Sequence, residues 1–157
     1  MCGICGIVNT DPSVQVQAGT IKRMTDSLIH RGPDEEGIFV DGPAALGHRR
    51  LSIIDLSTGQ QPLFSPDSSK VIVFNGEIYN FPQIRQRLVQ KGHSFRTRSD
   101  TEVILHLYEE KGRACVRDLR GMFAFAIYDR KARTLFAARD RIGKKPFYYL
   151  ADDRRFI

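Results

Sequence analysis

The second residue of the chain is a cysteine, in the opening run Met1-Cys2-Gly3-Ile4-Cys5. Removal of the initiator methionine, which the small side chain at position 2 favours, would leave Cys2 with a free α-amine beside its thiol. Such a residue combines a nucleophile with a base, because an amine and a thiol can exchange a proton near neutral pH without a histidine. A cysteine at position 2 is modest evidence by itself, so Cys2 is one candidate among others.

Cys2 and Cys5 also have the C-x-x-C spacing of redox and metal sites. A redox motif needs this pair at a strand-to-helix turn, a context that the N-terminal run does not offer. A zinc site needs four ligands. The histidines are scattered along the sequence, as His30, His48, His93 and His106. We therefore expect no metal site and no redox function, and we interpret Cys5 as a small buried residue.

The pair Asn75-Gly76 follows an apolar, β-branched run over residues 70–74. From spacing alone, Asn-Gly in this position is a strong signal for a tight hairpin turn. Alternatively, a strand could end here and present an amide side chain together with a glycine N–H. Two such donors would stabilise the oxyanion formed when a thiolate attacks a carboxamide. Taken alone, the spacing favours the turn.

Two charged residues could bind the ends of an amino-acid substrate. Arg50 lies in the run Arg49-Arg50-Leu51-Ser52-Ile53-Ile54, where its side chain would either face solvent or bind a carboxylate through its two-pronged guanidinium. Asp100 follows Ser99 at the expected start of a helix, where a carboxylate complements the helix dipole and could equally face an ammonium group. The residue types leave both alternatives open.

The elements that must position these residues follow from hydrophobic periodicity and from Gly, Pro and capping signals. The pattern predicts strands at 2–9, 37–40, 45–54, 70–74, 95–98, 122–128, 134–139, 147–150 and 155–157. It predicts helices at 20–30 and 81–91, a helix from the capping box Ser99-Asp100-Thr101-Glu102 to about 111, and a short turn of helix at 113–119. Adjacent hairpin-like strands favour α+β. The nearly continuous apolar strand at 122–128 indicates sheets that are covered by helices.

Composition agrees with one soluble globular domain, since 157 residues with 41% hydrophobic content can bury a single core. No apolar run approaches a membrane span and no signal segment is present, so we expect a cytoplasmic protein. The three cysteines suit a reducing compartment. The net charge of +6 is spread along the chain, which argues against nucleic-acid binding. The final apolar run suggests that the sequence is cropped from a longer chain, or that a neighbouring segment completes the edge of this strand.

Together these pieces resemble the glutaminase domain of the asparagine synthetase B family, within the class II (N-terminal nucleophile) glutamine amidotransferases. The resemblance covers nearly the whole chain, in the family's order and spacing. It rests on the following runs: Met1-Cys2-Gly3-Ile4, His30-Arg31-Gly32-Pro33-Asp34, Leu46-Gly47-His48-Arg49-Arg50-Leu51-Ser52-Ile53, Asn75-Gly76-Glu77-Ile78-Tyr79-Asn80, Ser99-Asp100-Thr101-Glu102, Leu119-Arg120-Gly121-Met122-Phe123-Ala124-Phe125 and Ala138-Arg139-Asp140-Arg141-Ile142-Gly143.

The resemblance implies a four-layer αββα sandwich and a role for each matching residue. Cys2 would attack the side-chain amide of glutamine with its α-amine as base, and Asn75 and the Gly76 N–H would form the oxyanion hole. The substrate α-carboxylate would bind Arg50, and its α-ammonium would bind Asp100 and Glu77. The same pocket would be lined by the backbone of Leu51, Ser52, Ile53 and Ile54. The product would be a γ-glutamyl thioester that water hydrolyses to glutamate.

The same resemblance implies an ATP-dependent synthetase domain later in the full-length chain, which would use Mg-ATP to amidate aspartate with the released ammonia. The present sequence corresponds to residues 1–157 of a truncated glutaminase domain, for which we expect no cofactor. A homodimer is compatible with this reading, whereas nucleic acid and membrane partners are not expected. The alternatives are a glutaminase domain from another class II amidotransferase pathway, or a docking module that has lost activity.

Overall fold

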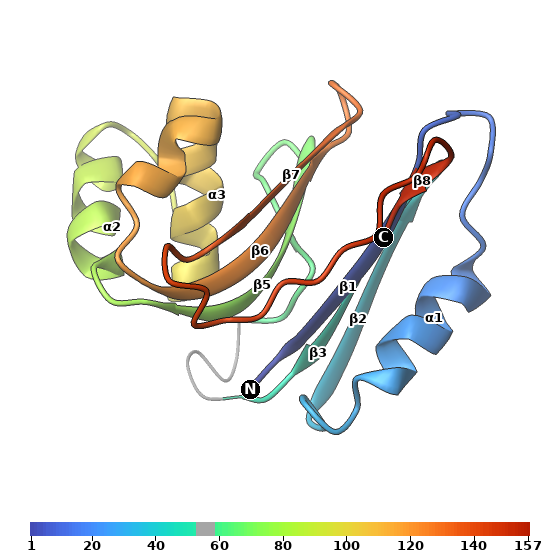
Figure 1. Cartoon of the computed structure of the whole chain (residues 1–157). Helices are drawn as coiled ribbons and strands as arrows, with labels where there is room; N and C mark the ends of the chain where they lie inside the picture. Colours follow the sequence, from blue (N-terminus) through green and yellow to red (C-terminus); the bar gives the residue numbers. More distant parts are fainter. Residues whose placement is uncertain (53–58) are drawn as a thin grey trace.

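The computed structural model describes residues 1–52 and 59–157, and these residues form two antiparallel sheets (Figure 1). In the first sheet the strand order is β2-β3-β1-β8, with bounds β1 Gly3–Asn9, β2 Glu35–Asp41, β3 Ala44–Arg50 and β8 Arg155–Phe156. In the second the order is β4-β5-β6-β7, with bounds β4 Leu63–Phe64, β5 Lys70–Ile78, β6 Gly121–Asp129 and β7 Thr134–Arg139.

Within the described residues, three α-helices and one 3-10 helix cover the outer faces of the sheets (Figure 1). Their bounds are α1 Ala18–Ser27, α2 Phe81–Gln90, α3 Asp100–Lys111 and η1 Gly112–Arg117. Helix α1 packs on the first sheet through Ile21, which joins Ile7 and Ala45 in one apolar cluster. Helices α2 and α3 pack on the second sheet, where Leu88 and Ile104 join a larger cluster. The arrangement is the expected αββα sandwich.

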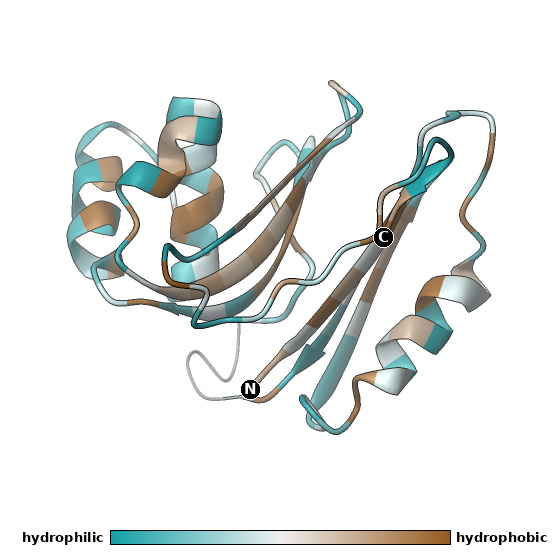
Figure 2. Cartoon of the chain, viewed as in Figure 1, coloured by the Kyte–Doolittle hydropathy of each residue, from teal (hydrophilic) through white to brown (hydrophobic). Residues whose placement is uncertain are grey.

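The strands bury both faces, and their alternation decides which side chains meet between the sheets. On β5, Val71 and Val73 pack toward the first sheet, whereas Ile72 and Phe74 pack toward the helices. Hydrophobic residues accordingly run along the facing strands of both sheets (Figure 2). By the same alternation, Asn75 belongs to the face between the sheets. Among the described residues, no helix is both long and apolar enough to cross a bilayer.

The hairpin turn favoured at Asn75-Gly76 is wrong, because β5 continues through both residues to Ile78. The strand stays paired with β6 throughout, with Asn75 opposite Ala124 and Gly76 opposite Phe123. A continuous partner strand therefore overrides the local preference of Asn-Gly for a turn. The strand expected at 70–74 is confirmed and is longer than expected.

Four other local expectations need correction. Residues 95–98 and 147–150 are not strands, although Leu150 exchanges two backbone hydrogen bonds with Ile157. The strand expected at 45–54 ends at Arg50, and residues 53–58 lie outside the described part of the chain. Ser99 caps α3 by accepting a hydrogen bond from the Thr101 N–H, but the reciprocal half of the capping box is replaced. The Glu102 carboxylate instead accepts from the N–H groups of Arg96 and Thr97.

Candidate active site

Cys2 directly precedes β1, and the register of the first sheet places it beside the end of β3. Gly3 pairs with Arg49, so Cys2 lies next to Arg50 and the residues that follow it. The half-buried thiol of Cys2 lies 3.8 Å from the Leu51 carbonyl oxygen. On the other side, the Cys2 carbonyl accepts a hydrogen bond of 3.2 Å from Arg31 Nε. Cys2 is thus held between two chain segments that the sequence had singled out.

Arg31 was not assigned a role from sequence, although it belongs to the loop His30-Arg31-Gly32-Pro33-Asp34. Besides its bond to Cys2, its Nη2 atom is buried without a hydrogen-bond partner among the described residues. The side chain lines a cavity of about 580 Å³ between the two sheets, which Asn75 and Gly3 also line. Arg31 therefore brings positive charge to this cavity, next to the backbone of Cys2.

Asn75 is 5% exposed and projects into the space between the sheets. The backbone of β6 lies very close to Gly76, the next residue. A Cβ atom at this position would lie 2.2 Å from the Met122 carbonyl oxygen and 2.7 Å from Phe123 Cα. Only glycine fits there without displacing the backbone. This close approach explains why glycine follows Asn75 inside a strand.

The Gly76 N–H points away from β6, toward the edge of β5 that lies beyond the short strand β4. The Phe123 N–H and carbonyl are used on the opposite side of β6, in bonds to Asp140, so Gly76 and Phe123 form a non-hydrogen-bonded pair. On the same edge as Gly76, Phe74 N donates to Gln61 Oε1 at 2.7 Å and Ile78 N donates to Asp100 Oδ2 at 2.9 Å. The Gly76 N–H lies between these two anchored groups.

Asp100 begins α3 and is 5% exposed. Burial is the largest effect on the carboxyl group of Asp100 and raises its pKa to about 6. Hydrogen bonds from backbone N–H groups lower this pKa, whereas the nearby charge of Glu77 raises it. The bond to Ile78 fixes this carboxylate at the end of β5, next to Glu77. The two acidic residues expected to act together are therefore neighbours, and a cationic group would be stabilised there.

Arg50 ends β3 and is 4% exposed. Its Nη1 atom lies 2.8 Å from Glu35 Oε2, across the pairing of β3 with β2. Beyond it, the Ser52 N–H donates to Asp34 Oδ2 at 2.7 Å, which ties this segment to the loop after α1. Leu51 thus lies beside Cys2, Ser52 is tied to Asp34, and Ile53 and Ile54 lie outside the described residues.

His48 and Gln61 were not expected to matter, yet they join the layers around the site. His48 Nε2 lies 3.2 Å from the Phe74 carbonyl oxygen, so it connects β3 to β5. Gln61 accepts from Phe74 N and donates through Nε2 to Thr101 Oγ1 at 3.3 Å, connecting β5 to α3. Sequence spacing gives no sign of these contacts, because they join segments that are more than ten residues apart.

Comparison with known proteins identifies the family. A family model described as a glutamine amidotransferase domain matches residues 1–157. Asparagine synthetase [glutamine-hydrolyzing] 3 of Bacillus subtilis is 42% identical over 100% of the chain and 26% of that protein. A probable asparagine synthetase [glutamine-hydrolyzing] of Dictyostelium discoideum is 44% identical over 94% of the chain and 27% of that protein. The chain spans about a quarter of the length of these curated relatives.

Solved structures show the same fold. Glutamine phosphoribosylpyrophosphate amidotransferase from B. subtilis, complexed with ADP and GMP, superposes with a TM-score of 0.75 and 26% identity. A structure described as the allosteric regulatory enzyme of purine biosynthesis gives a TM-score of 0.76, also at 26% identity. Each match covers 98% of this chain and 40% of the other. These likenesses confirm the expected α+β sandwich.

Proposed function

Because the chain belongs to the glutamine amidotransferase family, we propose that its residues hydrolyse glutamine within a glutamine-dependent asparagine synthetase. The closely similar relatives are named for that activity, which supports the assignment. The observation that most supports the reaction is the edge of β5. There the Gly76 N–H stands between two anchored N–H groups, and Asn75 lines the same cavity as Gly3, the residue that follows Cys2.

In the proposed reaction, Met1 is first removed and the Cys2 α-amine accepts the thiol proton. The thiolate attacks the side-chain carbonyl carbon of glutamine, and a C–S bond forms. The negative charge that develops on the carbonyl oxygen is stabilised by the Asn75 amide and the Gly76 N–H. The C–N bond then breaks as the ammonium group of Cys2 returns its proton to the leaving ammonia. Water hydrolyses the thioester, which releases glutamate and restores the thiol.

Substrate orientation follows from the charges around the site. Arg50, held by Glu35, would bind the α-carboxylate of glutamine through its planar fork. Asp100, with Glu77 beside it, would bind the α-ammonium. The backbone of Leu51, Ser52, Ile53 and Ile54 would line the pocket. One complementary group is thus available for each polar end of glutamine, and the reaction needs no metal or cofactor in this domain.

The ammonia would pass to a synthetase domain of the same full-length protein, where Mg-ATP would activate aspartate. The relatives that support this role are about four times longer than the present chain. A different acceptor pathway is the second candidate, because the similar solved structures include a phosphoribosylpyrophosphate amidotransferase. The third candidate is a docking module without catalytic activity, which would release no glutamate from glutamine. We further propose a cytoplasmic location, in which the thiol of Cys2 stays reduced.

The test is glutamate release from glutamine by protein whose intact mass shows the loss of Met1. We expect activity in this form, accumulation of a covalent glutamyl adduct on rapid quenching, and neither in Cys2→Ala. Cys5→Ala is the matched control, because burial, with a smaller effect of Glu36, raises the pKa of the Cys5 thiol to about 12 and makes it a poor nucleophile. Equal hydrolysis by Cys2→Ala, or full activity in protein that retains Met1, would refute the mechanism.

A further inference from the structure

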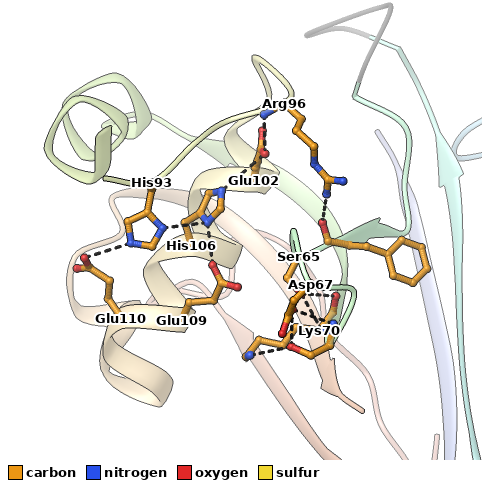
Figure 3. A network of polar contacts seen from close by, with 11 residues as sticks. Ser65, Asp67, Lys70, His93, Arg96, Glu102, His106, Glu109 and Glu110 are labelled. Atoms are coloured by element: carbon orange, nitrogen blue, oxygen red, sulfur yellow. Dashed lines mark hydrogen bonds and ion pairs between the residues drawn. The ribbon is translucent and has the colours of Figure 1, made fainter. Parts of the chain in front are cut away.

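Two histidines that are far apart in the sequence meet on the outer side of the second sheet (Figure 3). His93 follows α2 and His106 lies in the middle of α3, and their Nδ1 atoms are 3.2 Å apart. Glu109 Oε2 lies 2.8 Å from the same Nδ1 atom of His106. These three atoms all lie within 4.8 Å of one another. Two imidazole nitrogens and a carboxylate oxygen therefore converge on one point.

The second nitrogen of each ring faces a carboxylate. His93 Nε2 lies 3.3 Å from Glu110 Oε1, and His106 Nε2 lies 3.7 Å from Glu102 Oε1. The His106 ring is 1% exposed, and its Nε2 atom has no hydrogen-bond partner among the described residues at the observed separation. A carboxylate behind each imidazole is the usual outer arrangement of a histidine-ligated metal, because it fixes the tautomer and raises the basicity of the ligating nitrogen.

We propose that His93, His106 and Glu109 form a binding site for a divalent transition metal ion of the Zn²⁺ class. Zn²⁺ lies about 2.0–2.1 Å from imidazole nitrogen, and tetrahedral ligands at that range are about 3.3 Å apart. The observed spacing of 3.2 Å between the two Nδ1 atoms fits this geometry. Two nitrogen ligands favour Zn²⁺, Co²⁺, Ni²⁺ or Cu²⁺ over Mg²⁺ or Ca²⁺, which prefer oxygen.

The site is reachable from solvent on one side. The side chains of His93 and Glu109 are 21% and 22% exposed, whereas His106 is buried beneath them. An ion could enter past the two outer ligands and keep water at its fourth position. Such an ion would join the segment after α2 to α3, beyond the contacts already present there. It would stand about 9 Å along the helix axis from Asp100, at a rise of 1.5 Å per residue.

Bound metal would also restrain the segment that leads to the active site. Glu102, the carboxylate behind His106, accepts hydrogen bonds from the N–H groups of Arg96 and Thr97 at 2.9 and 2.7 Å. Figure 3 shows this chain of contacts from His93 to Arg96. A ligated His106 would therefore hold Glu102 in place, and Glu102 holds the loop before Asp100. Because an ion that binds only the folded state stabilises it, occupancy should raise the melting temperature.

The experiment uses tag-free protein treated with a chelator, in a Cys2→Ser background that removes the half-buried thiol of Cys2 as a competing ligand. Zn²⁺ is titrated against a chromophoric chelator, and Co²⁺ binding is followed by visible absorption. We expect one equivalent of either ion, a tetrahedral Co²⁺ band and a higher melting temperature. His93→Gln and Glu109→Gln should each abolish these signals. Glu110→Gln should weaken Zn²⁺ binding about 10- to 100-fold, as expected for loss of a carboxylate behind a ligand.

His30→Gln is the matched control, because His30 is an exposed histidine outside this cluster. It should bind metal like the parent protein. His93 is the decisive position, since its partly exposed ring can be replaced without emptying the core. Undiminished Zn²⁺ binding in His93→Gln, or no saturable binding in the parent, would overturn the proposal. Neither readout depends on glutamine hydrolysis, so failure of this site would leave the proposed activity untouched.

Discussion

The imidazole of His48, on β3, lies 3.2 Å from the carbonyl oxygen of Phe74, on β5 of the facing sheet. Burial is the largest effect on His48 and lowers its pKa to about 4. The hydrogen bond to Phe74 raises this pKa, whereas the nearby charge of Arg50 lowers it. The ring is therefore neutral at physiological pH and donates Nε2–H to this oxygen. Phe74 directly precedes Asn75, so the contact sets where the proposed oxyanion donors stand relative to the sheet that carries Cys2.

Replacement of His48 should affect both stability and rate. In His48→Ala the buried Phe74 carbonyl loses its donor, which should cost about 1–3 kcal/mol of unfolding free energy. We expect a lower kcat with little change in KM, because Asn75 shifts while the groups that bind the ends of the substrate remain. His48→Gln, whose amide can donate, should recover part of both losses. Denaturant unfolding and steady-state kinetics give the two quantities, and an unchanged kcat in the alanine variant would refute this positioning role.

Asn75→Ala removes one of the two proposed oxyanion donors. The expected result is a fall in kcat of roughly 10²–10³ with KM for glutamine nearly unchanged, because the interaction forms mainly in the transition state. Asn80→Ala is the control. Asn80 bonds to the Asp118 carbonyl and the Arg120 N–H, a purely structural bridge. That variant should lose stability but keep kcat within a few-fold, so a similar loss of rate in both variants would argue against the assignment.

Gly76→Ala should disrupt the site through sterics alone. Its new Cβ would lie 2.2 Å from the Met122 carbonyl oxygen, so β5 must separate from β6 near the proposed oxyanion hole. We expect a loss of more than about 1–3 kcal/mol in stability, the usual range for overpacking, together with a large loss of activity. Gly19→Ala is the matched change in α1, where the nearest atom is 3.7 Å away. Thermal unfolding should show that variant to be neutral or slightly stabilised.

Asp100 should make stability and substrate binding depend on pH in opposite directions. Its pKa is raised from the ordinary value of 3.8 to about 6 by burial, with Glu77 adding to the effect. The folded state therefore holds this proton more tightly than the unfolded state. Protonated Asp100 therefore contributes fully to the free energy of unfolding below about pH 4. This contribution is lost as the pH rises through about 6, and the free energy of unfolding falls by an amount on the order of 2–3 kcal/mol. Glutamine binding, in contrast, needs the carboxylate and should weaken below pH 6.

Asp100→Asn separates these two effects. The variant should gain stability relative to the parent between pH 4 and 7, because a neutral amide has no charge to desolvate and its oxygen can still accept from Ile78 N. Its KM for glutamine should rise and should no longer increase as pH falls through 6. Unfolding at several pH values, combined with a pH profile of kcat/KM, measures both. A parent enzyme whose KM stays constant from pH 5 to 7 would contradict the proposed contact with the substrate ammonium.

Much of the fold could be predicted from sequence, because apolar alternation reports burial directly. The strands at 122–128 and 134–139 and the helix starting at Ser99 are confirmed within a residue or two. The prediction of a turn at Asn75-Gly76 was wrong because pairing with β6 overrides the local preference of these residues. Sequence spacing does not reveal this pairing. The proposal that these two residues are oxyanion donors comes from the resemblance to a family and not from periodicity. The pairing of β5 with β6 then shows that the Gly76 N–H lies on the other edge of β5.

The contacts that were missed all depend on how the layers pack. His48 and Phe74 are on different sheets, and His93 and His106 are brought together because the segment that follows α2 packs against α3. In the sequence the four histidines are far apart. No spacing rule predicts which of them meet, because this depends on how the helices pack. Arg31 could have been suspected only through the family resemblance, because it belongs to the matching run His30-Arg31-Gly32-Pro33-Asp34. Its bond to the Cys2 carbonyl follows from the loop after α1 passing beside the N-terminus.

Lys145 is 5% exposed, and its ammonium group lies 3.0 Å from the sulfur of Met1, the residue that precedes the proposed nucleophile. Processing at this point would therefore change the electrostatic surroundings of Cys2 as well as its covalent structure. A buried cation would be left close to a newly created amine. Maturation would thus place the new amine in surroundings unlike those of an ordinary, fully solvated chain end.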